Sequence, residues 1–296
     1  MNKLPHVAVL GATGAVGQEY TVEEAKPDSF KDIDIALFAG GKVSEVLAPE
    51  AVRRGAVVID NSSAFRMDPQ VPLIIPEINP EDIEKHRGII ANPNCSTIIM
   101  LMALKPIYDL SPIKRVIVST YQAVSGAGKE GIDELYGETE AVSKGTVYEP
   151  KILPSVSLPK HYPIAYNLIP QIDIFLDNKI LHDEDITITP TAVRVPVIRS
   201  HAESIYVETA ASLSTKQIKE AMKSFPGVVL VDDIKKQVYP MPLDTSNKTD
   251  VAVGRIRKDL YNKRGINLWV CGDQIRKGAA LNTLQIAEYM IAHDMF

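Results

Sequence analysis

Short apolar runs alternate with a helical pattern over the first hundred residues of the chain. Runs rich in branched aliphatic residues at positions 6–10, 33–38 and 56–60 predict buried strands. Between the second and the third run, positions 43–54 predict a helix that Gly55 ends. Strands that alternate with helices in this way are typical of a parallel, doubly wound sheet.

The pattern changes after position 95. Six runs, several of them alternating, predict strands at 115–124, 187–197, 203–210, 228–232, 251–257 and 266–271. One clear helix interrupts them, because Ser214 and Gln217 can form a capping box and Pro226-Gly227 follow its end. A last helix, 278–293, has an expected apolar stripe of Ala279, Ala280, Leu284, Ala287 and Ile291. Many strands with few helices indicate a mixed or antiparallel sheet with helices on one face.

Composition narrows the class of protein. A chain of 296 residues, 45% hydrophobic and 23% charged, is long enough for two domains with cores of their own. Its net charge of -5 argues against a nucleic-acid surface, which is normally basic. Two cysteines cannot form a disulfide framework, and no segment reaches about 18 uninterrupted apolar residues. We therefore expect a cytoplasmic protein with no nucleic-acid partner and no membrane segment.

A glycine-rich turn, GATGAVG at positions 11–17, follows the first predicted strand. Glycines in such a turn let the backbone approach a pyrophosphate, and the amide groups of a following helix point at it. The spacing G-x-x-G-x-x-G is a variant, so the turn alone leaves open a nucleotide site or a plain tight turn. Only positions 18–32 separate it from the next strand, too few for a helix, a strand and a return.

Cys95 stands in the segment ANPNCSTI, where one apolar run ends at Pro93 and another begins at Ile98. Free cysteines are among the most buried residue types, so a structural thiol is one interpretation. The polar neighbours of Cys95 favour another, a nucleophile at the N-terminus of a helix, where the macrodipole stabilises a thiolate. Cys271 lies in an apolar run and is expected to be an ordinary strand cysteine.

Two further segments carry groups suited to a catalytic site. Arg194 and His201 are seven residues apart, a spacing at which a strand running into a loop can aim both side chains into one cleft. Arginine offers a planar fork for a carboxylate, and histidine offers a proton near neutral pH. The segment QAVSGAG after Tyr121 is either only a turn or a place where a ligand approaches the backbone and Gln122 hydrogen-bonds it.

Taken together, these segments resemble the bacterial aspartate-semialdehyde dehydrogenases over nearly the whole chain. Their order along the chain is that of the family, and an ordered set is far more specific than any one of its members. The segments are GATGAVG, NSSAFR, ANPNCSTI, STYQAVSGAG, KHYPIAYNLIPQID, RVPVIRSHAES, VGRIRKD and KGAALNTLQIAE.

The resemblance implies a fold class and a domain layout. We expect an α/β protein in which a Rossmann-like parallel-sheet cofactor domain accompanies an α+β, mixed-sheet catalytic and dimerisation domain. Residues 1–94 and 277–296 would form the NADP-binding domain, and residues 95–276 the catalytic and dimerisation domain.

The resemblance also implies residue roles in catalysis. Cys95 would be the nucleophile, His201 the general acid/base, and Gln122 would orient the substrate carbonyl. Arg194 would hold the substrate carboxylate, with Arg66 and Asn94 helping to bind phosphate. A thiolate that adds to the aldehyde gives a hemithioacetal, which loses a hydride to the nicotinamide and becomes a thioester. Phosphate then releases the acyl phosphate, and biosynthesis runs the reverse.

Cofactor and partners follow from the same resemblance. NADP is the expected cofactor, and no metal is expected. Its binding residues would be Gly11, Thr13, Gly14, Ala15, Val16 and Gly17 around the dinucleotide, with Ser125, Gly126 and Asn282 near the nicotinamide. The substrates would be aspartyl phosphate, aspartate semialdehyde and phosphate, in the synthesis of lysine, threonine, methionine, isoleucine and diaminopimelate. A homodimer or homotetramer is expected.

The chain departs from the family in two places. Family members carry a helix, a strand and a loop that reads the 2′-phosphate after the first glycine turn, and this stretch is absent here. They also carry a helix with a Glu and a Lys where positions 179–185 are too short to contain one. Because the flanks match, we hypothesise that both segments belong to the natural protein. Without them, the sequence does not predict NADP over NAD.

Two alternatives stay open on sequence alone. N-acetyl-gamma-glutamyl-phosphate reductase shares the cysteine-histidine logic, although ANPNCST and YQAVSGAG favour the semialdehyde enzyme. A non-catalytic dinucleotide-binding protein is the other, and it predicts no special reactivity at Cys95.

Overall fold

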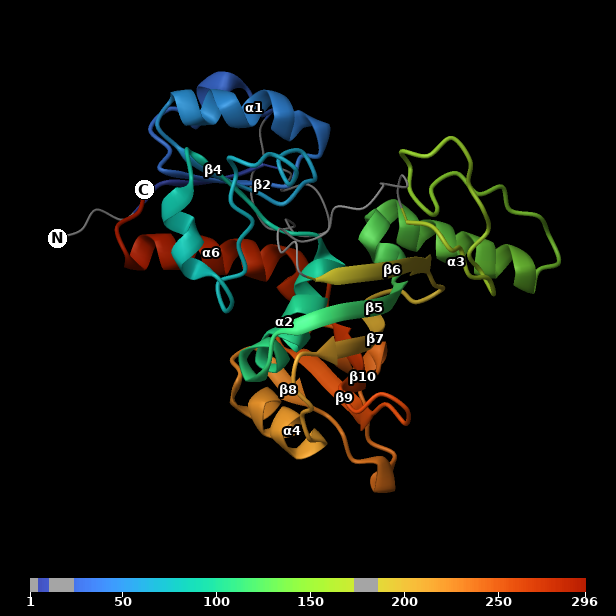
Figure 1. Cartoon of the computed structure of the whole chain (residues 1–296). Coiled ribbons are helices and arrows are strands. Elements are labelled where there is room, and N and C mark those ends of the chain that lie inside the picture. The colour runs from blue at the N-terminus through green and yellow to red at the C-terminus, as the bar shows by residue number, and fades with distance from the viewer. Residues whose placement is uncertain (1–4, 11–23, 173–185) are drawn as a thin grey trace. The chain divides into compact units, whose positions relative to one another are not determined.

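The computed structural model describes residues 5–10, 24–172 and 186–296 (Figure 1). The chain divides into two compact units, Met1–Ile98 with Ile275–Phe296 and Ile99–Gln274. The short segment 179–185 lies outside the described residues, as do the expected cofactor residues Gly11, Thr13, Gly14, Ala15, Val16 and Gly17. Among the described helices, none combines the length and the apolar character that a membrane span requires.

The first unit is built on a four-stranded parallel sheet in the order β1-β2-β3-β4. Its strands are β1 Val7–Leu10, β2 Ile35–Phe38, β3 Val57–Asp60 and β4 Ile89–Ala91. Helix α1, Lys42–Arg53, covers one face, and helix α6, Leu281–Ala292, covers the other (Figure 1). Because both faces are buried, the central strands are continuous apolar runs rather than alternating ones.

Loops at the carboxyl edge of this sheet are tied to neighbouring strands. The N–H of Asn61 donates to the carbonyl oxygen of Phe38, and the N–H of Asn92 donates to that of Asp60, both at 2.8 Å. Each bond joins the first residue after one strand to the last residue of its neighbour. The segments NSSAFR and ANPNCSTI therefore start side by side at the edge where ligands of parallel sheets usually bind.

The second unit contains a six-stranded mixed sheet in the order β6-β5-β7-β10-β9-β8. The outer pairs β5-β6 and β8-β9 are parallel, and the three inner pairs are antiparallel. The strands are β5 Ile113–Gln122, β6 Thr187–Arg194, β7 His201–Thr209, β8 Val228–Leu230, β9 Val251–Lys258 and β10 Gly265–Gly272. The helices of this unit are α3 Lys129–Ser143, α4 Thr215–Ser224, α5 Pro242–Thr245 and most of α2 Cys95–Leu110, whose first four residues belong to the first unit. Together the parallel and the mixed sheet confirm the expected fold class.

Alternation along β7 decides which of its side chains lie in the interior. His201 and Glu203 are buried, whereas Ser204 is exposed on the opposite face. Gly272 pairs with His201, and a Cβ on Gly272 would lie 3.0 Å from Cγ1 of Ile99 in α2. Helix α2 therefore covers the face that carries His201 and Glu203.

Helix α3 is not expected from the sequence, which indicates a single helix among the strands of this unit. Gly131 and Gly137 weaken its pattern, because glycine is a poor helix former. A Cβ on Gly131 would lie 2.6 Å from the carbonyl oxygen of Val124, and one on Gly137 would lie 2.6 Å from Cε2 of Tyr148. Both glycines thus permit close packing against neighbouring segments.

Two buried glutamates of α3 hold the segment that follows it. The carboxylates of Glu134 and Glu138 accept backbone N–H groups at 2.6–3.2 Å. The donors are Lys151, Ile152, Leu153, Ile164 and Ala165. Burial raises the pKa of Glu138, although the backbone bonds oppose this shift. The segment has almost no regular structure of its own, so these bonds replace a strand partner.

The closing helix differs from the expected one in its buried face. Leu284 is 46% and Ile291 37% exposed, so both are wrongly placed in the predicted apolar stripe. The face that packs on the sheet contains Ile286 and Met290. Polar Asn282 lies on that buried side, which is why a count of apolar residues selects the wrong stripe.

Candidate active site

Cys95 is the first residue of α2, is partly exposed and forms no disulfide. Beside it, the side-chain oxygen of Asn94 accepts the N–H of Ser96 at 3.0 Å. This bond caps the helix, because the first N–H groups of a helix have no hydrogen-bond partner within it. A thiolate at this position gains from the positive end of the helix dipole. The sequence predicts this helix start correctly.

Arg66 interacts electrostatically with Cys95. Burial lowers the pKa of the Arg66 guanidinium, and the charges of Cys95 and Asp60 oppose that shift. Its Nε donates to the carbonyl oxygen of Asn92 and its Nη2 to that of Asn61, each at 2.9 Å. Because a guanidinium remains charged, it favours the thiolate and offers a site for a small anion.

In the second unit, Gly126, Arg194 and His201 lie together. A Cβ on Gly126 would be 2.9 Å from Nη1 of Arg194 and 3.2 Å from Cε1 of His201. Arg194 is buried and donates from Nη1 to the carbonyl oxygen of Ala123 at 2.9 Å and from Nη2 to that of Pro154 at 3.0 Å. The spacing of seven residues thus does bring Arg194 and His201 together, and Gly126 leaves room for both.

The protonation of His201 differs from what the residue type alone predicts. The N–H of Ala123 donates to Nδ1 of His201 at 3.1 Å. A ring nitrogen that accepts a hydrogen bond carries no proton, so the neutral ring holds its proton on Nε2. Burial and the charge of Arg194 lower the pKa of His201 well below its ordinary value. At neutral pH His201 is therefore an uncharged N–H donor.

Gln122 and Ser125 are held by neighbours in the same unit. Gln122 ends β5, is buried and donates from Nε2 to Oγ1 of Thr120 at 3.2 Å. Ser125 Oγ accepts Nε2 of Gln274 at 2.5 Å, and Oε1 of Gln274 accepts the N–H of Ser200 at 2.9 Å. Sequence reasoning misses Gln274, whose only signal is its place just after the predicted strand 266–271.

Asn282 lies in the interior of the first unit rather than at a surface. It is 0% exposed, and its Nδ2 donates to the carbonyl oxygen of Ile74 at 2.9 Å and to Oδ1 of Asn92 at 2.6 Å. Its Oδ1 accepts Nζ of Lys277 at 2.9 Å. Both amide N–H groups are therefore used within the protein, and the expected place of Asn282 near the nicotinamide stays a prediction.

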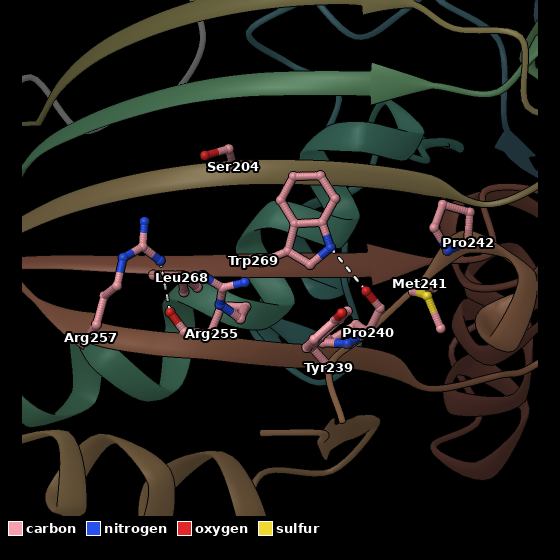
Figure 2. A pocket seen from close by; sticks show the side chains of 9 residues that line it. All are labelled: Ser204, Tyr239, Pro240, Met241, Pro242, Arg255, Arg257, Leu268 and Trp269. Carbon is pink, nitrogen blue, oxygen red and sulfur yellow. Dashed lines mark hydrogen bonds between the residues drawn. The ribbon is translucent and has the colours of Figure 1, made fainter. Parts of the chain in front are cut away.

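Cys271 and the hollow in Figure 2 involve none of these side chains. Burial raises the pKa of Cys271 to about 12, so it remains a thiol. The hollow, of about 330 Å³, lies on the sheet face that carries Ser204 and Trp269. It is lined by Ser204, Tyr239, Pro240, Met241, Pro242, Arg255, Arg257, Leu268 and Trp269. None of the expected catalytic residues is among them.

Comparison with known proteins decides the family. The semialdehyde dehydrogenase NAD binding domain matches residues 18–86, and the semialdehyde dehydrogenase dimerisation domain matches residues 104–277. The aspartate-semialdehyde dehydrogenase of Bacillus subtilis is 49% identical, with 96% of both chains covered. The chain belongs to the aspartate-semialdehyde dehydrogenase family. As a member of it, the chain is an enzyme, an oxidoreductase that acts on an aldehyde group.

Other aspartate-semialdehyde dehydrogenases are similar to this chain over most of its length. That of Aquifex aeolicus is 49% identical, covering 94% of this chain and 86% of its own. The solved structure of aspartate semialdehyde dehydrogenase II from Vibrio cholerae, complexed with ASA, is 39% identical with a TM-score of 0.88 and covers 100% of both chains. The alignment with the Bacillus enzyme spans 333 positions, more than the 296 residues here, so that relative has residues this chain lacks.

Proposed function

We propose that this aspartate-semialdehyde dehydrogenase reduces 4-aspartyl phosphate to aspartate semialdehyde and phosphate with NADPH, and runs the reverse oxidation, through a thioester on Cys95. One observation carries the proposal. Cys95 is partly exposed at the first position of α2 and is coupled to the charge of Arg66.

The first step needs only the chain and the acyl phosphate. The thiolate of Cys95 attacks the acyl carbon, a carbon–sulfur bond forms, the carbon–oxygen bond to the phosphate breaks, and inorganic phosphate leaves. Arg66 and Asn94, both close to the start of α2, bind that phosphate group. In the reverse direction phosphate attacks the thioester and releases the thiolate.

His201, Gln122 and Arg194 act on the substrate. The neutral His201 donates from Nε2 to the oxygen on which negative charge develops during attack. Gln122 orients that carbonyl, and the fork of Arg194 holds the substrate carboxylate. To act as a base, His201 must first give up the bond that Nδ1 accepts from Ala123, because Nε2 already carries a proton.

The carboxyl edge of the first sheet suits a dinucleotide. When bound, NADPH supplies the hydride that reduces the thioester. The N–H of Ala39 donates to the carbonyl oxygen of Leu10 at 3.0 Å, so the chain after β2 lies against the end of β1, which the glycine turn follows in sequence. Gly41 has φ +56, and apart from its chain neighbours no atom of the described residues lies within 4 Å of a Cβ placed there. The backbone there is open enough for a pyrophosphate, while Ser125 and Gly126 are assigned to the nicotinamide.

Two copies associate, in this proposal, through the sheet face that carries Trp269. The dimerisation-domain match covers this sheet. On that face the rings of Tyr121 and Trp269 have centroids 5.5 Å apart, and Ile117 is 38% exposed. Sedimentation of a Trp269→Asp variant tests this: a monomer supports the assignment, and an unchanged oligomer contradicts it.

The decisive test is phosphate-dependent reduction of NADP with aspartate semialdehyde or N-acetylglutamate semialdehyde. The wild-type enzyme should turn over the first aldehyde, Cys95→Ser should not, and the control Cys271→Ser should retain activity. Turnover by Cys95→Ser would exclude the thioester, and a preference for NAD would exclude the cofactor assignment.

A further inference from the structure

The first unit contains a buried charged pair that the mechanism above does not use. Lys277 is 1% exposed and donates from Nζ to Oε2 of Glu77 at 2.5 Å and to Oε1 of Gln285 at 2.8 Å. Burial lowers the pKa of Lys277, and the charge of Glu77 opposes that shift. Lys277 lies in a π-helical turn, Arg276–Ala280. Such turns are rare in proteins as a whole, but those that occur are often found at functional sites.

Lys277 is also the first member of a chain of hydrogen bonds through side-chain amides. Its Nζ donates to Oδ1 of Asn282 at 2.9 Å, and Nδ2 of Asn282 donates to Oδ1 of Asn92 at 2.6 Å. In turn, Nδ2 of Asn92 donates to Oδ1 of Asn61 at 2.6 Å. Lys277, Asn282 and Asn92 are all buried, so water does not compete for these bonds.

The direction of these amide hydrogen bonds is set by the ammonium group of Lys277 together with the carbonyl oxygen of Ile74, which can only accept. A side-chain amide can flip and exchange its donor with its acceptor, whereas an ammonium can only donate. The oxygen of Asn282 must therefore face Lys277, which turns its N–H groups toward Asn92. The oxygen of Asn92 must then face Asn282, which turns its own N–H groups toward Asn61.

The last residues in this series of hydrogen bonds, Asn92 and Asn61, contact Arg66, the residue whose charge interacts with Cys95. Arg66 donates to the backbone carbonyl oxygens of Asn61 and Asn92, the two residues whose side chains are bonded to each other. Asn92 also precedes Cys95 by only three residues. The amide chain therefore holds both loops on which the position of Arg66 depends.

We propose that Lys277 is a positioning residue for the nucleophile: through Asn282 and Asn92 it fixes the two carbonyl groups that hold Arg66 near Cys95. The inference rests on the proposed function of Cys95. It also gives the buried side chain of Asn282 a role in this set of hydrogen bonds.

The test is the rate at which iodoacetamide alkylates Cys95 in the full chain, mapped by peptide mass between about pH 5 and pH 9. The variants are Lys277→Met and the double variant Lys277→Met with Glu77→Gln. The single variant leaves the part-buried carboxylate of Glu77 with the hydrogen bond from Nε2 of Gln285 but without its cation, so it can fail to fold, and the double variant removes that charge. Lys219→Met is the control, since it breaks another ion pair to a buried carboxylate, that of Asp232.

Loss of the fixed orientation should raise the midpoint of the alkylation profile by about one pH unit, which makes the reaction roughly tenfold slower at pH values well below the midpoint. We expect this in the double variant, with Lys219→Met at the wild-type rate. A reactive wild-type Cys95 with an equally reactive double variant would overturn the inference alone. A wild-type Cys95 no more reactive than Cys271 would overturn the proposed function and the inference with it.

Discussion

The backbone N–H of Ala123 donates a hydrogen bond of 3.1 Å to Nδ1 of His201. This contact places the ring proton on Nε2, and burial beside Arg194 keeps the ring uncharged. His201 is thus prepared to donate a hydrogen bond to a developing oxyanion, as a neutral electrophile does. Its use as a base requires a change of tautomer.

Stability should depend on pH through His201. The folded state keeps the ring neutral, whereas the unfolded chain binds a proton below about pH 6.5, so the free energy of unfolding falls as the pH falls below that value. The slope from one such group is at most about 1.4 kcal/mol per pH unit. His201→Gln should remove it in urea unfolding at pH 7 and pH 5. An unchanged pH dependence would argue against a neutral buried ring.

Glu203 should have the opposite dependence. It is 0% exposed, both its carboxylate oxygens lack a hydrogen-bond partner among the described residues, and burial raises its pKa well above the ordinary value. The unfolded chain releases this proton above about pH 4.3, so the free energy of unfolding falls as the pH rises, by at most about 1.4 kcal/mol per unit. Glu203→Gln should be more stable than the wild type at pH 8.

The exposed Glu288 provides a control for that experiment. Glu288→Gln should change the free energy of unfolding by less than about 0.5 kcal/mol. If Glu203→Gln lowers stability at pH 8 instead, Glu203 is ionised in the folded state.

Gly126→Ala should damage the site without unfolding the protein. The new Cβ would lie 2.9 Å from Nη1 of Arg194, which is itself bonded to Ala123, so the guanidinium must move. A misplaced binding group costs on the order of 10²-fold in kcat/KM. Gly145→Ala is the contrast, because its open surroundings and φ of +64 predict a loss of about 1 kcal/mol in stability with normal activity. Equal activity of the two variants would contradict the close approach.

Arg66→Gln should slow alkylation of Cys95 and raise the KM for phosphate. The substitution removes the charge that favours the thiolate, and a rise of one pH unit in the alkylation midpoint corresponds to an about tenfold slower reaction at pH values well below the midpoint. Arg87→Gln, which changes an exposed arginine, should leave both quantities unaltered. A normal alkylation rate in Arg66→Gln would show that the guanidinium does not act on the sulfur.

Most strands and most helices follow from hydrophobic periodicity, although β4, Ile89–Ala91, is not among the predicted strands. Strands predicted at 33–38 and 266–271 appear as Ile35–Phe38 and Gly265–Gly272, and the capping box of Ser214 and Gln217 forms as expected. Periodicity fails for α3, because Gly131 is retained for close packing rather than for helix formation. The local pattern does not show which residues become buried against segments that are distant in the sequence.

In the candidate site, too, local features could be predicted from the sequence, whereas burial by distant segments could not. The position of Cys95 at a helix start can be predicted from its polar flanks and the apolar run that follows. Lys277 and Glu203 could not be predicted as buried, since each becomes buried only when strands or helices distant in the sequence pack around it. Alternation of Glu203 with apolar Ile205 is the one local hint, and it appears only after the strand is assigned.

Glu134 and Glu138 stand one turn apart on α3, and that interval sets the distance between the two places where the irregular segment after the helix is fastened. Inserting one residue between them would rotate one carboxylate by about 100° and detach its half of the segment. Extra residues between positions 153 and 164 would leave both attachments intact. The spacing of the two glutamates on α3 therefore fixes the distance between the two attachment points. Insertions are tolerated in the irregular segment but not between the two glutamates of the helix.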